Sequence, residues 1–216
     1  ILERLKSLES EKNEALAATS IFEEILARYP DEKEALRSLA GRSKGLGRRG
    51  DEITYLERLL AIDSTDKSTL NTIAYAYNDV GQVEKSLWAI NRYVALVPNE
   101  PNPYDSRGDL YAYNGKPHEA IESYQLALQK KPGFMSGEKL GWMFIYTGEY
   151  DRADSVFKSM ATSPDRTIRS QGREQLHYVS SYKGQFRRAL SQLDEAISAD
   201  RLEGYDGVWY NNKLYD

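Results

Sequence analysis

Glycine recurs along this chain at an almost constant interval, and this periodicity limits the possible folds more strongly than any other property of the sequence. Five glycines follow one another at spacings of 34, 34, 33 and 36 residues: Gly47, Gly81, Gly115, Gly148 and Gly184. Prolines repeat the interval in a different phase, because Pro132 lies 34 residues after Pro98, and Pro98 lies two such intervals after Pro30. A period of this length predicts stacked structural repeats rather than one large globular core.

Between these glycines and prolines, the apolar residues have the spacing of amphipathic helices. In 120–128 they fall on one face of a helix with 3.6 residues per turn: Ala120, Ile121, Tyr124, Ala127 and Leu128. The same spacing recurs in 86–96, 153–160 and 189–197. No segment alternates apolar and polar residues between hairpin turns, so the sequence predicts no strands.

Each repeat is therefore predicted to be two helices of roughly 12–15 residues, joined at the glycine and separated from the next pair near the proline. Glycine suits the bend because it adopts a positive φ without a Cβ clash. Asp31 with Glu34 predicts a capping box at one helix start, and Asn102 followed by Pro103 predicts an N-cap and a first-turn proline at another.

The repeats resemble the tetratricopeptide repeat, whose pattern is W-x2-L-G-x2-Y, then A-x3-F, then P, over 34 residues. Residues 101–134 carry the pattern most completely, with Tyr104, Arg107-Gly108, Tyr111, Ala120, Tyr124, Ala127 and Pro132. The resemblance covers nearly all of the 216 residues and implies an all-α, right-handed solenoid of antiparallel helix pairs. It divides a single array into repeats of about 1–32, 33–66, 67–100, 101–133, 134–167 and 168–203, with 204–216 as a C-terminal helix or a truncated seventh repeat.

Three features depart from the family pattern. Glu52 and His177 stand where the pattern favours small side chains, and the connection at 163–167 makes the step from the fifth to the sixth repeat long. We expect His177 to be a packing residue, because the only other histidine, His118, lies in a different repeat and two such residues cannot form a metal cluster.

Composition excludes several classes of function. The chain has no cysteine, so it has no disulfide framework, thiolate catalysis or zinc–thiolate site. A net charge of −4 argues against general binding of nucleic acid. No apolar run is long enough to insert into a membrane. The absence of cysteine and of a targeting segment favours a cytoplasmic location.

Two short motifs resemble catalytic or nucleotide sites but lack the context that such sites need. Residues 41–45 match G-x-S-x-G and residues 45–50 match G-x-G-x-x-G. Both motifs require a preceding strand, and here they fall in a predicted helix and in a repeat bend. We therefore predict no enzyme activity, no cofactor and no metal.

The resemblance implies that the first helices of the pairs line a concave groove that holds a peptide. Carried onto this chain, the candidate residues are Asn71, Tyr75, Asn78, Asp105, Asp109, Tyr113, Trp142, Tyr146, Tyr178 and Tyr182. The chain has 16 tyrosines, and tyrosine gives a large contact area with a polar tip and little loss of side-chain entropy. The alternative is that these tyrosines only fill gaps between neighbouring helices.

The sequence thus predicts a non-enzymatic scaffold that binds a peptide or partner segment in the groove. Two alternatives stay open. The chain begins at Ile1 and its last residues look cut short, so it could be the regulatory or sensory part of a larger signalling or transcription protein. It could also assemble with itself through apolar residues at the solenoid ends: Leu2, Leu5, Trp209, Tyr210 and Leu214.

Overall fold

The computed structural model describes residues 19–204, which form two compact units that meet at the bond between Pro98 and Asn99. The predicted end-to-end contacts of Leu2, Leu5, Trp209, Tyr210 and Leu214 lie outside the described residues, as do most of the first helix of the first repeat and the predicted C-terminal helix at 204–216.

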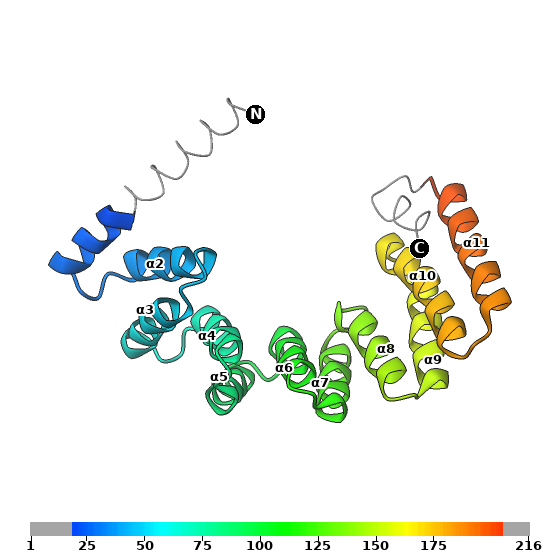
Figure 1. Cartoon of the computed structure of the whole chain (residues 1–216), viewed down its shortest axis with the longest axis horizontal. Helices are drawn as coiled ribbons and strands as arrows, with labels where there is room; N and C mark the ends of the chain where they lie inside the picture. The colour runs from blue at the N-terminus through cyan, green and yellow to red at the C-terminus, as the bar shows by residue number, and fades with distance from the viewer. Residues whose placement is uncertain (1–18, 205–216) are drawn as a thin grey trace. The chain divides into compact units, whose positions relative to one another are not determined.

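The described residues are helices joined by short connections, without a strand (Figure 1). In the N-terminal unit, residues 19–28 are helical and are followed by α2 (Lys33–Gly45), α3 (Arg49–Ile62), α4 (Lys67–Asp79) and α5 (Val83–Leu96). The C-terminal unit comprises α6 (Asn102–Tyr113), α7 (Pro117–Lys130), α8 (Ser136–Tyr146), α9 (Tyr150–Ala161), α10 (Arg166–Tyr182) and α11 (Phe186–Leu202).

Within each unit every helix packs against the helices next to it in the chain. In the N-terminal unit α3 contacts both α2 and α4, and in the C-terminal unit α7 contacts α6 and α8 while α9 contacts α8 and α10. This is the predicted arrangement of helix pairs, in which one pair covers the apolar face of the next. None of the described helices combines the length and the apolar character that crossing a membrane requires.

The five periodic glycines form the bends inside the pairs, as predicted. Each has a positive φ, between 67° at Gly115 and 78° at Gly148. At Gly115 the chain turns tightly, with the Gly115 amide donating to the Ala112 carbonyl at 3.1 Å and the Lys116 amide donating to the Tyr111 carbonyl at 2.9 Å. These bonds satisfy carbonyl groups that the end of α6 would otherwise leave unpaired.

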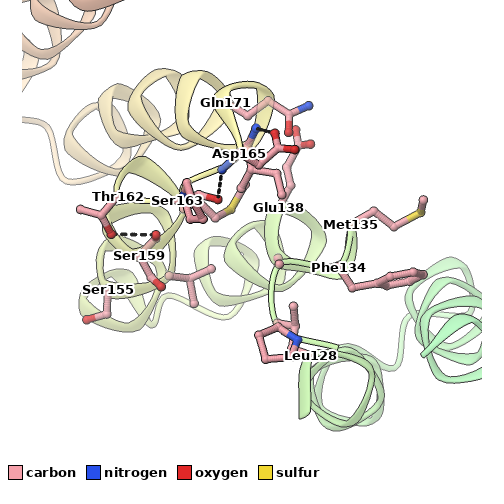
Figure 2. Close-up of a pocket in the computed structure, with 17 residues that line it drawn as sticks. Leu128, Phe134, Met135, Glu138, Ser155, Ser159, Thr162, Ser163, Asp165 and Gln171 are labelled. Carbon is pink, nitrogen blue, oxygen red and sulfur yellow. Dashed lines mark hydrogen bonds between the residues drawn. The ribbon is translucent and has the colours of Figure 1, made fainter. Parts of the chain in front are cut away.

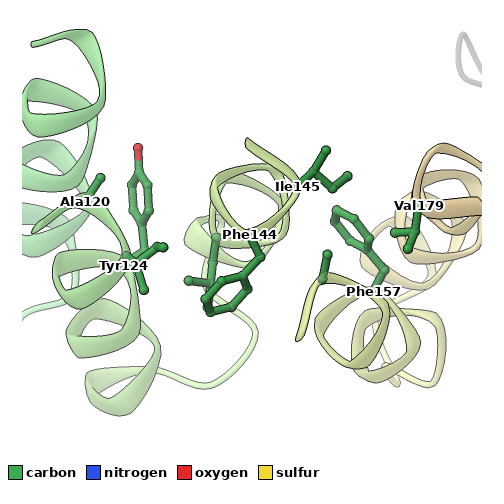
Figure 3. Close-up of a cluster of buried hydrophobic side chains, with 9 residues drawn as sticks. Ala120, Tyr124, Phe144, Ile145, Phe157 and Val179 are labelled. Carbon is green, nitrogen blue, oxygen red and sulfur yellow. The ribbon is translucent and has the colours of Figure 1, made fainter. Parts of the chain in front are cut away.

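Small residues on the first helix of a pair face large residues on the second. A Cβ built on Gly108 would lie 2.4 Å from the Tyr124 ring, and one on Gly141 would lie 2.3 Å from the Phe157 ring. Phe157 is fully buried and belongs to a cluster that also contains Phe144 and continues to α10 through Val179 (Figure 3). The tetratricopeptide pattern of small and large residues therefore reflects direct contact in this unit.

Two predicted helix caps are wrong by one residue. The N-cap of α2 is Glu32 rather than Asp31, because the helix begins at Lys33 and the Glu32 carboxylate accepts the Glu34 amide at 3.1 Å. Asn102 does not cap α6. Pro101 already has helical backbone angles (φ −73°, ψ −34°), so that Asn102 is the first residue of the helix.

Candidate functional site

The candidate groove residues all lie on the first helix of a pair, which we call the A helix. The seven in the C-terminal unit come from α6, α8 and α10: Asp105, Asp109, Tyr113, Trp142, Tyr146, Tyr178 and Tyr182. Ion pairs of Lys139 with Asp105 and Asp109 link α8 to α6, and the contact of the Trp142 and Tyr178 rings links α8 to α10. We add Lys139 to the seven candidates for this reason. We call these eight residues the A-helix face.

Tyrosine ends each A helix of the C-terminal unit. Tyr113, Tyr146 and Tyr182 are the last residues of α6, α8 and α10, and each lies two residues before the bend glycine. Their exposed fractions are 68%, 73% and 57%. A structural gap-filler would be covered by its neighbours, so these three side chains, which we call the tyrosine row, do not have the burial expected from the gap-filling alternative.

One turn before the tyrosine row, the aromatic side chains of α8 and α10 contact one another. The Trp142 ring lies 5.0 Å from the Tyr178 ring in a tilted arrangement and 6.3 Å from the Tyr182 ring in an edge-to-face arrangement. Such pairs stabilise by about 0.5–1.5 kcal/mol beyond the area they bury. Trp142 and Tyr178 are therefore half-buried and hold the two A helices together, whereas Tyr182 offers more of its ring to solvent.

The α6 side of the face is charged. The Lys139 ammonium lies 2.8 Å from a carboxylate oxygen of Asp105 and 2.8 Å from one of Asp109. Asp105 is buried and also accepts the Ser136 hydroxyl at 2.6 Å. Burial alone would lower the pKa of Lys139, but its hydrogen bonds to the two carboxylates outweigh this effect and raise the pKa.

Tyr124 joins the charged cluster from the second helix of its pair. Its hydroxyl donates to Asp109 at 2.8 Å. Burial is the main reason that the pKa of Tyr124 is raised, and the Asp109 charge adds to it. Asp109 is thus held by two donors, and two carboxylates share one ammonium, so this side of the face has a net negative charge.

The three candidate residues of the N-terminal unit lie on α4. Asn71, Tyr75 and Asn78 are all half-buried, and the Asn71 side-chain oxygen is buried without a hydrogen-bond partner. The positions that match the tyrosine row are Gly45 on α2 and Asp79 on α4, and Asp79 pairs with Arg49 at 2.9 Å. The aromatic row is therefore a property of the C-terminal unit within the described residues.

Sequence reasoning missed a cavity of about 750 Å³ in the C-terminal unit (Figure 2). It lies where the connection from α7 to α8 faces the end of α9 and the start of α10, and Phe134, Met135, Val156, Met160 and Ile168 supply apolar walls. Glu138 also lines it, and its carboxylate accepts the Gln175 amide at 3.1 Å. The only sequence signal was the long step between Gly148 and Gly184.

The two motifs that resembled catalytic or nucleotide sites have helical surroundings. Ser43 is buried within α2, and residues 45–50 run from the end of α2 through the bend into the start of α3. Over residues 19–204, no three side chains of the types that bind metals converge on one point.

Comparison with known proteins agrees with this fold. Residues 102–133 match the family model of the tetratricopeptide repeat. A comparison with curated proteins finds no match.

Solved structures of tetratricopeptide-repeat type resemble the chain at low identity. The MamA protein is 16% identical over 82% of this chain and 96% of its own, with a TM-score of 0.63. A tetratricopeptide repeat protein from Parabacteroides merdae ATCC 43184 is 16% identical over 88% of this chain and 75% of its own, with a TM-score of 0.68. YrrB, described as a TPR protein with an unusual peptide-binding site, is 14% identical over 90% of this chain and 98% of its own, with a TM-score of 0.56. The chain therefore has the fold of tetratricopeptide-repeat proteins, and its repeat at 102–133 matches the family model directly.

Proposed function

We propose that the chain is a protein-interaction scaffold that binds a segment of a partner protein on the A-helix face of its C-terminal unit. The observation that carries the proposal is the tyrosine row. Three successive A helices end in a tyrosine that is more than half exposed. Exposed tyrosines at a regular spacing suit an extended or helical segment that crosses several repeats, because each ring provides contact area at little cost in entropy.

The charges of the face favour a basic partner segment. The α6 side of the face carries the two carboxylates of Asp105 and Asp109 and the one ammonium of Lys139. A lysine or arginine of the partner would be attracted to this side, and its aliphatic carbons could pack on the exposed aromatic rings. The similarity to YrrB supports a peptide as the ligand, because that protein shares the fold and has a peptide-binding site.

The test begins with a peptide selected from a random library on the purified chain. Its affinity is then measured for the variant Tyr113→Ala/Tyr146→Ala. Both side chains are exposed, so the variant should keep its helical content and its unfolding midpoint. We expect affinity to fall by about 30-fold to several hundredfold, since interface tyrosines that act as anchors cost roughly 1–2 kcal/mol each when truncated, or roughly 2–4 kcal/mol for the pair.

The matched control is Tyr29→Ala. Tyr29 is 66% exposed but lies in the N-terminal unit, outside any A helix. It removes the same side chain from the same kind of surface and should leave the affinity unchanged. Equal affinities of the double variant and the wild-type chain would exclude the A-helix face as the binding site.

Self-association is a second candidate function, because α11 exposes large apolar side chains. Phe186 and Leu190 lie one turn apart on this helix and are 68% and 65% exposed, and Leu202 is 91% exposed. Such a face could pack on another copy of the chain. Sedimentation over a range of concentrations should then show a dimer that Phe186→Ser/Leu190→Ser dissociates. A single monomeric species at every concentration would exclude this candidate.

A further inference from the structure

The cavity in the C-terminal unit exists because two neighbouring A helices differ in length. Both α8 and α10 end two residues before a bend glycine, but α8 has 11 residues and α10 has 17. With a rise of 1.5 Å per residue, α10 extends roughly 9 Å further from its bend than α8 does. The connection from α7 to α8 fills the corresponding place only in part.

Gly172 fixes α10 in this position. A Cβ on Gly172 would lie 2.2 Å from the Ala161 backbone nitrogen, so α10 approaches the end of α9 as closely as a glycine allows. The residues of α10 that precede Gly172 continue past this contact toward the α7–α8 connection. There the Ile168 side chain lies opposite Gly133, and a Cβ on Gly133 would lie 3.7 Å from the Ile168 Cδ1 atom. The cavity is the space between these α10 residues, the end of α9 and the α7–α8 connection.

The walls of the cavity combine apolar side chains with negative charge. Glu138 and Asp165 are the only ionisable side chains among its 17 lining residues, and no lysine, arginine or histidine is among them. Asp165 caps α10 by accepting the Thr167 and Ile168 amides at 2.9 and 3.0 Å. Glu138 extends from the first turn of α8, where Gln175 holds one of its oxygens.

Two cations that neighbour lining residues in the chain have other partners. Lys139, the next residue, is bound by Asp105 and Asp109. Arg169, one residue after Ile168, pairs with Glu203 at 2.8 Å and donates to the Ser163 carbonyl at 2.6 Å. Burial raises the pKa of Glu138, and the neighbouring Lys139 charge lowers it only in part. A cation brought to the cavity would therefore meet a carboxylate that has lost part of its hydration.

We propose that this cavity receives an apolar side chain of a partner segment that carries a lysine or arginine beside it, with the cation paired to Glu138. The volume of about 750 Å³ lies within the range of ligand sites in proteins. Apolar contacts with Met160, Val156 and Ile168 supply the attraction for the side chain, and the carboxylate selects the charge. This site is separate from the tyrosine row, so it stands or fails independently of the proposed binding at the A-helix face.

The three methionines of the chain allow a direct test. Met135 and Met160 line the cavity, whereas Met143 packs against the hydrophobic core and provides an internal reference. We suggest NMR of isotope-labelled methionine methyl groups during titration with hexylammonium, hexanol and hexanoate, which share an apolar chain and differ in charge. Hexylammonium should shift the Met135 and Met160 signals at millimolar concentration and leave Met143 in place. It should bind about tenfold more tightly than hexanol, and hexanoate should bind least.

The variant Glu138→Gln separates charge recognition from the apolar contact. It keeps the size of the side chain and its position beside Gln175, so the unfolding midpoint should change little. The preference for hexylammonium over hexanol should disappear, while hexanol binding persists. Equal binding of the three compounds to the wild-type chain, or a preference for hexylammonium that survives in Glu138→Gln, would overturn the proposal.

A second variant tests the location independently of charge. Ser159 lies on the exposed side of α9 and lines the cavity, so Ser159→Trp should fill it without entering the core. All three compounds should then lose their effect on Met160, with circular dichroism showing unchanged helical content. If hexylammonium still shifted Met160 in this variant, or if none of the compounds shifted it in the wild-type chain, the cavity would not be the site.

Discussion

The N-terminal and C-terminal units agree in the residues that pack helices together and differ in the residues that A helices expose. Seven positions before the bend glycine, α2 and α4 of one unit have Ala40 and Ala74, and α6 and α8 of the other have Gly108 and Gly141; only α10 departs, with His177. Two positions before the bend, the C-terminal unit repeats tyrosine, whereas the N-terminal unit has Gly45 and Asp79. Packing against the next helix restricts which residues fit at the first of these positions. At the second position, only solvent or a ligand restricts the choice of residue.

The units also differ in how they handle buried charge. In the N-terminal unit, Glu52 is 1% exposed at a position where the C-terminal unit has Ala120 and Ala153, and Arg49 pairs with it at 2.7 Å. In the C-terminal unit, Asp200 near the end of α11 is also 1% exposed, and it pairs with Arg173 at 2.7 Å. Each of these two carboxylates thus has an arginine beside it.

The largest expected effect tests the shared packing position. Gly141→Ala would place a methyl group 2.3 Å from the buried Phe157 ring, so we expect a loss of about 2–3 kcal/mol in the free energy of unfolding. The matched variant is Gly41→Ala, in α2, where a Cβ meets nothing within 4 Å. There alanine should stabilise by about 0.5–1 kcal/mol through its higher helix propensity. Urea denaturation measures both, and similar changes in the two variants would contradict the packing argument.

A smaller effect tests the buried charge of the N-terminal unit. Arg49→Met removes the cation beside Glu52, and we expect a loss of about 1–2 kcal/mol. The usual cost of breaking a buried pair is higher, but the Arg49 side chain is 30% exposed. The double variant Arg49→Met/Glu52→Ala should recover most of the loss in urea denaturation, because alanine is the residue that the C-terminal unit has at this position. Equal stability of the single and double variants would show that the Glu52 charge is not the cause.

The smallest effect concerns the acid sensitivity of the last described helix pair. Hydrogen bonds from Arg169 and then Arg173 lower the pKa of Glu203 from 4.5 to about 2. A carboxylate with a lowered pKa stabilises the fold above its unfolded-state value, and this contribution is lost as the pH falls from 4.5 toward 2. Urea midpoints for Glu203→Gln should therefore lie below those of the wild-type chain at neutral pH and converge with them in this acidic range.

The control for acid sensitivity is Asp194→Asn, which changes an exposed carboxylate on the same helix. Its urea midpoints should stay parallel to those of the wild-type chain throughout the titration. If Glu203→Gln behaved in the same way, the contacts with Arg169 and Arg173 would not contribute to the stability of this pair.

The sequence was sufficient to predict the elements whose causes are local. A glycine with positive φ marks a bend wherever it occurs, and five such bends set the phase of every described pair. The same period places Lys139 one repeat after Asp105 and Tyr178 one repeat after Trp142. It could therefore be predicted that the two residues of each pair lie on neighbouring A helices. Which atoms meet depends on side-chain conformations, and the Lys139 contact with both carboxylates could not be read from spacing.

The cavity could not be predicted from the repeat pattern because it depends on a difference between two repeats. Ser163-Pro164-Asp165 before α10 signals a helix start, and Asp165 does cap that helix. By contrast, α8 begins at Ser136 without a side-chain cap. Helix ends without a cap are the hardest boundaries to predict from a sequence. Here the start of α8 is such a boundary, and its position determines whether the cavity exists.

The unequal lengths of α8 and α10 have a consequence for how such arrays diversify. Residues added at the start of an A helix are far from its bend and contact the far end of its partner helix, as Ser170 of α10 contacts Asp200 of α11, so they leave the glycine bends and the alternation of small and large residues in place. Evolution can thus change the surface between two neighbouring repeats without altering the other repeats of the array. A new ligand surface then requires only an insertion of a few residues, followed by ordinary substitution along its rim.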